Sequence, residues 1–346
     1  MLSNWKGLLS LLLLTTTHTL LANNNPVELG KIHWERNFEA GLAKAKATQK
    51  PVFLLFQEVP GCSTCRSYGA NILSHPLIVE AIETLFIPVA IHNNKKGADA
   101  EVLNFYREPS WNNPVVRIVK ADKKDIIPRV NGKYNKLAVV QAMRLALETE
   151  NLVVPTYLRL LEEELLGLQG IPASATFSMF CFWTGEKEIG KLDGVLETQA
   201  GFMNGREVVN VTYDPDVLAY DDLLKNANAA KCASEVFTDD RQQAQQSAAI
   251  LGKSKVAEKG QFRLDKDPKY YLGRTNYRHV PMTQLQAVKV NSWIGQGKLP
   301  NQFLSPRQLV ILQLIEENPK VKWPDVINQD LRKGWASVEE LRKNSL

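Results

Sequence analysis

The sequence predicts an α/β domain followed by an α+β domain, with an irregular C-terminal tail. Its 346 residues exceed the usual length of a single domain. A continuous apolar run at 52–56 among helical patterns is typical of a central strand buried on both faces. Further along, strand patterns at 195–202 and 208–213 are joined by a short bend at Asn204-Gly205.

The first domain is expected over residues 27–150. Apolar residues recur at helical spacing over 34–48, and Pro51 then ends that pattern. The remaining elements follow in order: a strand at 52–56, a helix at 62–72, a helix at 75–84, a strand at 86–91, a proline-headed strand at 114–119 and an amphipathic helix at 137–148.

The second domain is expected over residues 170–255, after a connecting helix at 156–168. It comprises a strand at 175–182, a helix from Trp183 to Lys191, the two strands joined at Asn204-Gly205 and a helix at 220–230. The polar stretch after Asp239 has no clear periodicity. Residues 256–346 form a C-terminal extension that we expect to be irregular beyond Phe262, with tryptophans as anchors.

Residues 1–22 have the pattern of a signal peptide. Lys6 supplies a short positive region, Leu8 to Leu14 is apolar, and Ala22 suits a cleavage site. The apolar run is too short to span a bilayer, so we expect no stable membrane span. An uncleaved N-terminal anchor is the alternative. In either case the folded part is expected to be periplasmic or secreted.

The charge pattern excludes a nucleic-acid partner. The net charge is only +5, and the lysines and arginines are scattered along the chain. The densest cluster, from Lys120 to Lys124, also contains Asp122 and is typical of a solvated loop.

Cys62 and Cys65 form a C-x-x-C motif at the expected start of a helix. A helix N-terminus lowers the pKa of a thiol, and a second cysteine one turn later can resolve a mixed disulfide. Cys62 is therefore the predicted nucleophile and Cys65 the predicted resolving thiol. Half of a zinc site or a structural disulfide are the alternatives. Zinc would need two more ligands, and no partner spacing supplies them, so we expect no metal and no cofactor.

The order of strand, C-x-x-C, helix, strand and proline-headed strand resembles thioredoxin over residues 27–150. The resemblance implies that Pro114, preceded by Asn113, is the cis proline facing the dithiol. The Val-Pro-Gly lead-in to Cys62 resembles a bacterial thioredoxin-like branch. The intervening Ser63-Thr64 differs from the usual Gly-Pro of the family.

Residues 177–186 contain Cys181-Phe182-Trp183 and resemble the G-C-F-W-G-x-E signature of A-class peptide methionine sulfoxide reductases. Segments at 194–198, 200–202, 207–215 and 220–224 resemble that family in the same order. The resemblance implies that Cys181 attacks the sulfoxide sulfur and that Glu207 protonates the departing oxygen. Phe182 and Trp183 would form the apolar pocket for the substrate's methyl group.

The thiol that resolves a sulfenic acid on Cys181 is left open by the sequence. Cys232 is the candidate within the second domain, although it could equally be a buried thiol with no role in the reaction. Alternatively, Cys62 or Cys65 resolves the sulfenic acid directly. Asp240 matches a family aspartate. Gln245 stands where the family has tyrosine, and the family's substrate loop is shortened between Gly201 and Glu207. Tyrosines of the extension could replace the lost hydroxyls; these are Tyr270, Tyr271 and Tyr277.

These observations predict an exported reductase of peptide methionine sulfoxide whose dithiol domain is a fused electron donor. An upstream thiol reductant would recharge the dithiol. One alternative is a thiol–disulfide oxidoreductase with a degenerate second domain. Another is a non-enzymatic interaction protein that uses the aromatic residues of the extension.

Overall fold

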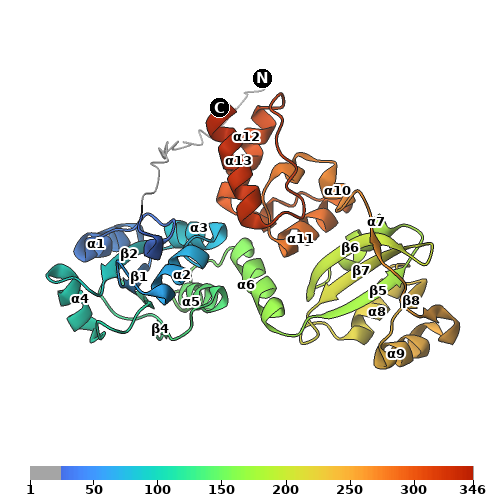
Figure 1. The fold of residues 1–346 in the computed structure, drawn as a ribbon, viewed down its shortest axis with the longest axis horizontal. Coiled ribbons are helices and arrows are strands. Elements are labelled where there is room, and N and C mark those ends of the chain that lie inside the picture. The colour runs from blue at the N-terminus through green and yellow to red at the C-terminus, as the bar shows by residue number, and fades with distance from the viewer. Residues whose placement is uncertain (1–24, 346) are drawn as a thin grey trace, which may run out of the picture.

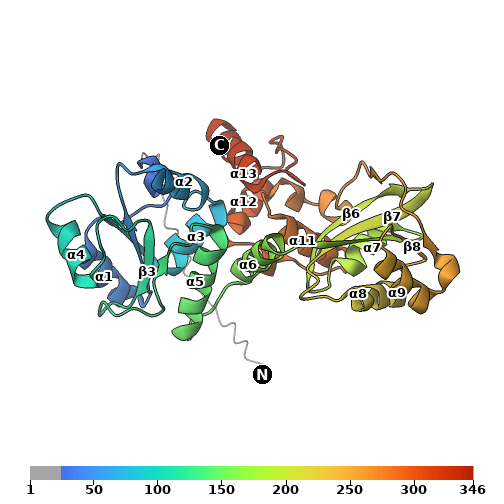
Figure 2. The same ribbon diagram turned by 60° about the horizontal axis from the view of Figure 1, so that its bottom comes forward.

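The computed structural model describes residues 25–345, and the predicted signal peptide at 1–22 lies outside this range. Two sheet domains lie at opposite ends of the molecule, with helices between them (Figures 1 and 2). Within the described range, no helix has both the length and the apolar character needed to cross a membrane.

The first domain is a four-stranded sheet in the order β2-β1-β3-β4. Strand β1 pairs parallel to β2 and antiparallel to β3, and every residue of β1 is buried. The elements are η1 (Val27–Leu29), α1 (Phe38–Thr48), β1 (Val52–Gln57), α2 (Ser63–Asn71), α3 (Pro76–Leu85), β2 (Ile87–His92), α4 (Ala98–Tyr106), β3 (Val115–Val119), β4 (Val130–Asn131) and α5 (Lys136–Thr149).

The second domain is a six-stranded sheet in the order β10-β6-β7-β5-β8-β9. It follows helix α6 (Thr156–Gln169), the expected connector. The elements are β5 (Ala173–Ser178), α7 (Phe182–Ile189), β6 (Val195–Met203), β7 (Arg206–Tyr213), α8 (Tyr220–Ala229), β8 (Glu235–Phe237), α9 (Arg241–Leu251), η2 (Lys253–Lys255), β9 (Val256–Ala257) and β10 (Arg263–Leu264).

Strands β6 and β7 form an antiparallel hairpin, and it turns at the predicted bend, where Asn204 and Gly205 both have positive φ. Strands β9 and β10 carry the sheet to Leu264, beyond the expected domain end at residue 255. The strand expected to reach Phe182 ends instead at Ser178, so that α7 begins at Phe182. Phe182 therefore lies in the first turn of a helix.

The C-terminal extension, here residues 265–345, is helical where an irregular tail was expected. Two capping boxes account for the difference: Thr283 with Gln286 begins α11, and Ser305 with Gln308 begins α12. Buried aliphatic side chains of these helices then build a separate apolar core. The elements are α10 (Tyr270–Gly273), η3 (Asn276–His279), α11 (Gln284–Gly295), η4 (Asn301–Phe303), α12 (Pro306–Glu317) and α13 (Leu331–Ser345).

The extension is joined to the first domain through buried polar contacts at the start of α12. Glu80 of α3 is fully buried and accepts from the Ser305 hydroxyl at 2.5 Å and from the Arg307 backbone N–H at 2.7 Å. Glu83 binds the Arg307 guanidinium. These contacts satisfy the free N–H groups of a helix start with a carboxylate, which also suits the helix dipole.

The extension is joined to the second domain through α11, which packs on α7 and β6. Val288 belongs to the apolar core of the second domain. The Ser292 hydroxyl donates to the Lys187 carbonyl at 2.6 Å, and Lys289 donates to the Leu192 carbonyl at 2.7 Å. One helical unit thus holds both sheet domains.

A buried histidine at the start of α3 predicts an acid-sensitive fold. Burial, with help from Lys136 and Arg332, lowers the pKa of His75 to about 3, while Asp330 opposes this shift. The folded state therefore binds fewer protons than the unfolded state between pH 6.5 and pH 3, and stability falls as pH falls through that window. Between pH 8 and pH 5, His75 should account for a loss of about 2 kcal/mol.

The measurement is the free energy of unfolding in urea at both pH values, for the parent and for His75→Leu. The variant should lose about 2 kcal/mol less than the parent on acidification. Equal losses in the two proteins would contradict this account of His75.

Candidate active site

The first candidate site is the dithiol at the N-terminus of α2. Cys62 is the N-cap residue and is exposed, whereas Cys65 is buried. Their sulfur atoms lie 3.6 Å apart, so a disulfide can close with little movement. The Cys65 thiol donates to the side-chain oxygen of Asn113, which precedes cis Pro114. The predicted proline therefore lies beside the dithiol.

Buried polar groups hold the backbone around the dithiol. The Gln57 amide donates to the Glu28 carbonyl at 2.7 Å and to the Cys65 carbonyl at 3.0 Å. The Glu28 carboxylate accepts from the Gly61 N–H at 3.0 Å. Sequence reasoning missed Glu28 and Gln57, because their partners are distant along the chain or are backbone groups.

The two thiols of this site differ in acidity. Hydrogen bonding to the Cys65 backbone N–H is the largest effect on Cys62 and lowers its pKa; burial opposes it, and hydrogen bonds to the Cys65 thiol and to Thr64 add to the lowering. Burial raises the pKa of Cys65 to about 12. Only Cys62 is therefore suited to act as a thiolate near neutral pH.

Glu58 joins Cys62 and Cys65 in the one group within residues 25–345 whose ligand atoms are close enough to hold a metal ion. These three ligand atoms lie within 4.8 Å of one another. Three protein ligands with an open fourth position are the donor number of a catalytic zinc site.

The second candidate site is Cys181 at the N-terminus of α7. Cys181 is the half-buried N-cap residue, and a negative charge on its sulfur would lie at the positive end of the helix dipole. The Glu207 carboxylate accepts from the Phe182 N–H at 2.9 Å, in the same first turn. The β6–β7 register pairs Glu207 with Phe202 next to the hairpin. The structure thus brings the predicted nucleophile and the predicted acid together.

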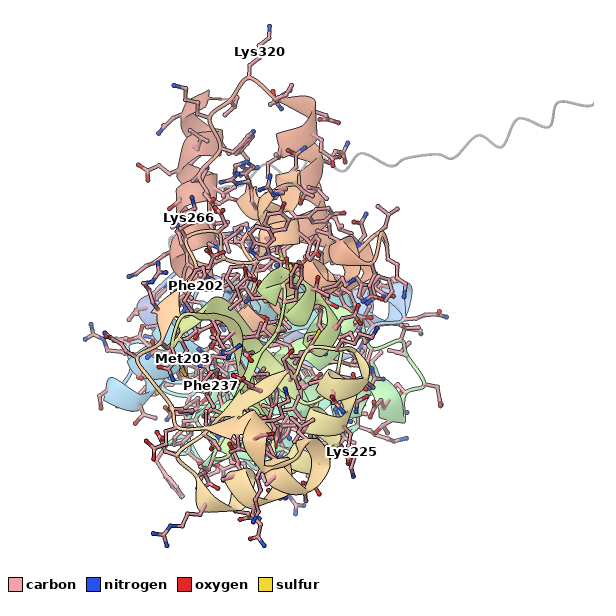
Figure 3. All side chains as sticks on the ribbon, turned by 90° about the vertical axis from the view of Figure 1, so that its right-hand side faces the viewer. Phe202, Met203, Lys225, Phe237, Lys266 and Lys320 are labelled. Carbon is pink, nitrogen blue, oxygen red and sulfur yellow. The ribbon has the colours of Figure 1, made fainter. Side chains whose placement is uncertain are left out.

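Aromatic rings line this site. The Phe182 ring is buried, with its centroid 5.4 Å from the Trp183 ring and 5.3 Å from the Phe202 ring. An open hollow of about 520 Å³ borders Phe202 and Arg263 at the end of the hairpin. Figure 3, which views the molecule from the side of the second domain, labels Phe202 and Met203 on this hairpin.

The extension reaches Trp183 directly. Tyr270 stacks on the Trp183 ring with centroids 3.7 Å apart and an angle of 14° between the planes. The Trp183 indole N–H donates to Asp265 at 3.1 Å, and Arg274 lies over the other ring of the stack, that of Tyr270. Of the three tyrosines considered from the sequence, Tyr270 is the one that contacts a predicted site residue.

A buried ion pair between Lys269 and Glu186 of α7 holds the segment of the extension that contacts Trp183. Lys269 and Glu186 are 2% and 1% exposed, and Nζ lies 3.0 Å from Oε1. Lys269 also donates to the Thr198 carbonyl, and the Thr198 hydroxyl donates to Glu186 at 3.3 Å. Because the partners are 83 positions apart, no local sequence signal predicts this pair.

Cys232 lies in the apolar core beside α7 and not on its surface. Its thiol donates to the Ala230 carbonyl at 3.3 Å. Burial first, then Glu188 and to a smaller extent Cys181, raise the pKa of Cys232 to about 11. The backbone N–H of Ser234, two residues later, donates to the carbonyl of Ser178, the last residue of β5. Cys232 therefore lies near the same end of β5 as Cys181. Its thiol is nonetheless a weak nucleophile at neutral pH.

Asp240 is not part of this group. It caps α9 by accepting from the Gln243 N–H at 2.8 Å, and the Gln243 side chain in turn donates to the Ser174 carbonyl. Ser174 is at the start of β5, whereas Cys181 follows its end, on the order of 13 Å further along the strand direction. The local geometry of a helix start explains the aspartate at this position.

Comparison with known proteins finds relatives of both domains. A family model described as thioredoxin-like matches residues 33–121. The peptide methionine sulfoxide reductase MsrA of Methanococcus maripaludis is 39% identical over 69 residues, 15% of this chain and 44% of that protein. MsrA 1 of Nostoc sp. is 31% identical over 123 residues, 26% of this chain and 74% of the relative.

This chain belongs to the MsrA family. The match spans less than half the length of the Methanococcus relative. The MsrA of Methanothermobacter thermautotrophicus is 42% identical over 67 residues, and the match covers 40% of its length. A solved structure titled DsbH Oxidoreductase is also similar, with 19% identity, a TM-score of 0.30, and coverage of 37% of this chain and 92% of that one.

The difference in acidity between Cys62 and Cys65 predicts selective alkylation. At pH 7, iodoacetamide should modify Cys62 at least about a hundredfold faster than Cys65, because only Cys62 has an appreciable thiolate fraction. The rate at Cys62 should level off at a pH below that of a free cysteine, whose pKa is about 8.5. Peptide mapping by mass spectrometry measures both rates, and a plateau at or above that of free cysteine would contradict the assignment.

The buried ion pair predicts a large effect of Lys269→Met. The change leaves the Glu186 charge buried without its partner and should cost about 3–5 kcal/mol of unfolding free energy, measured in urea. Lys266→Met, at an exposed neighbouring position, is the matched control and should cost less than about 0.5 kcal/mol. A loss below about 1 kcal/mol for Lys269→Met would show that the pair does not anchor the extension.

Proposed function

We propose that this chain is an exported reductase of methionine sulfoxide in peptides, with the dithiol of the first domain as its electron donor. The observation that carries the proposal is the first turn of α7. There Cys181, the Glu207 carboxylate and the rings of Phe182 and Trp183 converge in a chain of the MsrA family.

In the proposed reaction, the Cys181 thiolate attacks the sulfoxide sulfur, and protonated Glu207 gives its proton to the departing oxygen. The substrate leaves as a thioether, and Cys181 becomes a sulfenic acid. The apolar surface of Phe182 and Trp183 receives the methyl group. The open hollow beside Phe202 gives room for the flanking peptide, which favours a peptide-bound substrate over free methionine sulfoxide.

The dithiol resolves the sulfenic acid in this scheme. Cys232 is disfavoured because it is buried and protonated at neutral pH. Cys62 is exposed and has a lowered pKa, and Cys65 lies ready to close the disulfide. An upstream thiol reductant then restores the dithiol. The pattern of residues 1–22 supports export to a periplasmic or extracellular location.

A second function is favoured by the stacking of Tyr270 on Trp183. A centroid distance of 3.7 Å leaves no space for a methyl group between the two rings. If Tyr270 never moves and the remaining pocket does not bind sulfoxide, the chain is a thiol–disulfide oxidoreductase with a non-catalytic second domain.

Single-turnover kinetics with a peptide methionine sulfoxide separates these two functions. The pre-reduced parent should consume sulfoxide in stoichiometric amounts, whereas Cys181→Ser should show only the uncatalysed rate. Glu207→Gln should slow the chemical step by about 10²- to 10⁴-fold, the usual contribution of a general acid.

Cys62→Ser is the control for recycling. It should retain the first turnover and lose repeated turnover, and a small-molecule dithiol should restore it. Undiminished turnover by Cys181→Ser, or no turnover by a parent whose dithiol is still titratable, would overturn the proposed function.

A further inference from the structure

Each redox helix is anchored to the rest of the molecule at its C-terminal end. In the first domain, the Arg332 guanidinium of α13 donates to the Ala70 carbonyl at 3.1 Å and to the Asn71 carbonyl. These carbonyls end α2, which carries Cys62 at its other end. With a rise of about 1.5 Å per residue, the thiol lies about 13 Å from this anchor.

The same arrangement holds in the second domain. Helix α11 bonds to α7 at Lys187 through Ser292, and Lys269 binds Glu186 one position earlier. Cys181 lies at the opposite end of α7, where Asp265 and Tyr270 contact Trp183. Cys181 also follows the far end of β5, a strand that begins just after α6 and runs about 20 Å away from it. The hairpin that carries Glu207 lies at the outer end of the second domain (Figures 1 and 2).

The two thiol sites therefore point away from the helices that join their domains. Those helices are fixed by buried contacts at both ends: Glu80 with α12, and Lys269 with Glu186. Strand β5 carries the Cys181 segment away from α6, and Arg332 holds the end of α2 that is opposite Cys62. A disulfide between Cys62 and Cys181 of one chain would therefore require a buried junction to open.

We propose that electrons pass from the dithiol of one copy of this chain to Cys181 of a second copy; the inference rests on the proposed function. The Cys62 thiolate of one copy attacks the Cys181 sulfenic sulfur of the other, and hydroxide leaves and is protonated to water. Cys65 then attacks the Cys62 sulfur, the mixed disulfide breaks, and Cys181 leaves as a thiolate. The two thiols are oxidised to one disulfide, and the sulfoxide oxygen ends as water.

Both thiol ends carry an exposed aromatic side chain suited to this encounter. Trp111 is 80% exposed on the loop that leads to Asn113, whose side chain contacts the Cys65 thiol. Phe180 is 97% exposed and directly precedes Cys181. Large aromatic side chains are common anchors of protein–protein contacts, and neither of these is covered within its own chain.

The test is the rate at which the Cys62–Cys65 disulfide forms after a saturating peptide methionine sulfoxide is added to the pre-reduced parent. Thiol alkylation at timed quenches followed by mass spectrometry gives this rate. Tenfold dilution of the protein should slow it about tenfold, as expected for a second-order step between copies. A half-time that is unchanged by dilution would overturn the proposal, because transfer within one chain does not depend on concentration.

Complementation provides an independent arm. Pre-reduced Cys181→Ser is mixed with the Cys62→Ser/Cys65→Ser double variant, and the mixture should consume one further equivalent of sulfoxide for each dithiol added. No further consumption beyond that of the double variant alone would overturn transfer between copies. If the double variant alone consumes no first equivalent, the proposed function itself fails, and the two failures are thereby distinguished.

Trp111→Ala tests the contact. It should lower the second-order rate constant about tenfold, the effect of losing one aromatic anchor, while leaving the reduction of a small aromatic disulfide unchanged. Leu299→Ala, at an apolar residue of the extension that is 79% exposed, is the matched control and should have no effect. Equal effects of the two substitutions would contradict a role for Trp111 in docking.

Discussion

The organisation of this protein depends on leaving the Cys62 and Cys181 thiols accessible at the N-terminal ends of α2 and α7. Thiolate chemistry uses the backbone N–H groups and the dipole of a helix start, and the thiol at that end must remain within reach of its reaction partner. Cys62 and Cys181 both occupy such positions. The contacts that join the domains accordingly fall on the other ends of these helices, where carbonyl groups need donors. Arg332 and Ser292 supply those donors.

The extension does more than join the domains, because it completes the surroundings of Cys181. Asp265 and Tyr270 cover Trp183, and the buried Lys269–Glu186 pair holds these two residues in place. A buried ion pair adds little net stability on its own, but losing one partner is costly, so the pair fixes the register of the extension.

The elements that the sequence predicts well are those with a strong local signal. The apolar run of β1, the C-x-x-C at a helix start and the Asn204-Gly205 bend are all present. Helices α4 and α9 were not predicted because few of their residues are buried. The helices of the extension were also missed, although their capping boxes are readable in the sequence.

The candidate sites divide in the same way. Cys181 and Glu207 come together as their motifs imply, because β7 carries Glu207 past the start of α7. Asp265 and Lys269 could not be predicted, since a single charged residue in a polar segment gives no sign of a partner some 80 positions away. Asp240 is the opposite case, because it matches a family motif but acts in the structure as the N-cap of α9. Family motifs thus locate the predicted reacting residues, whereas the residues that hold them in place depend on tertiary contacts with the extension.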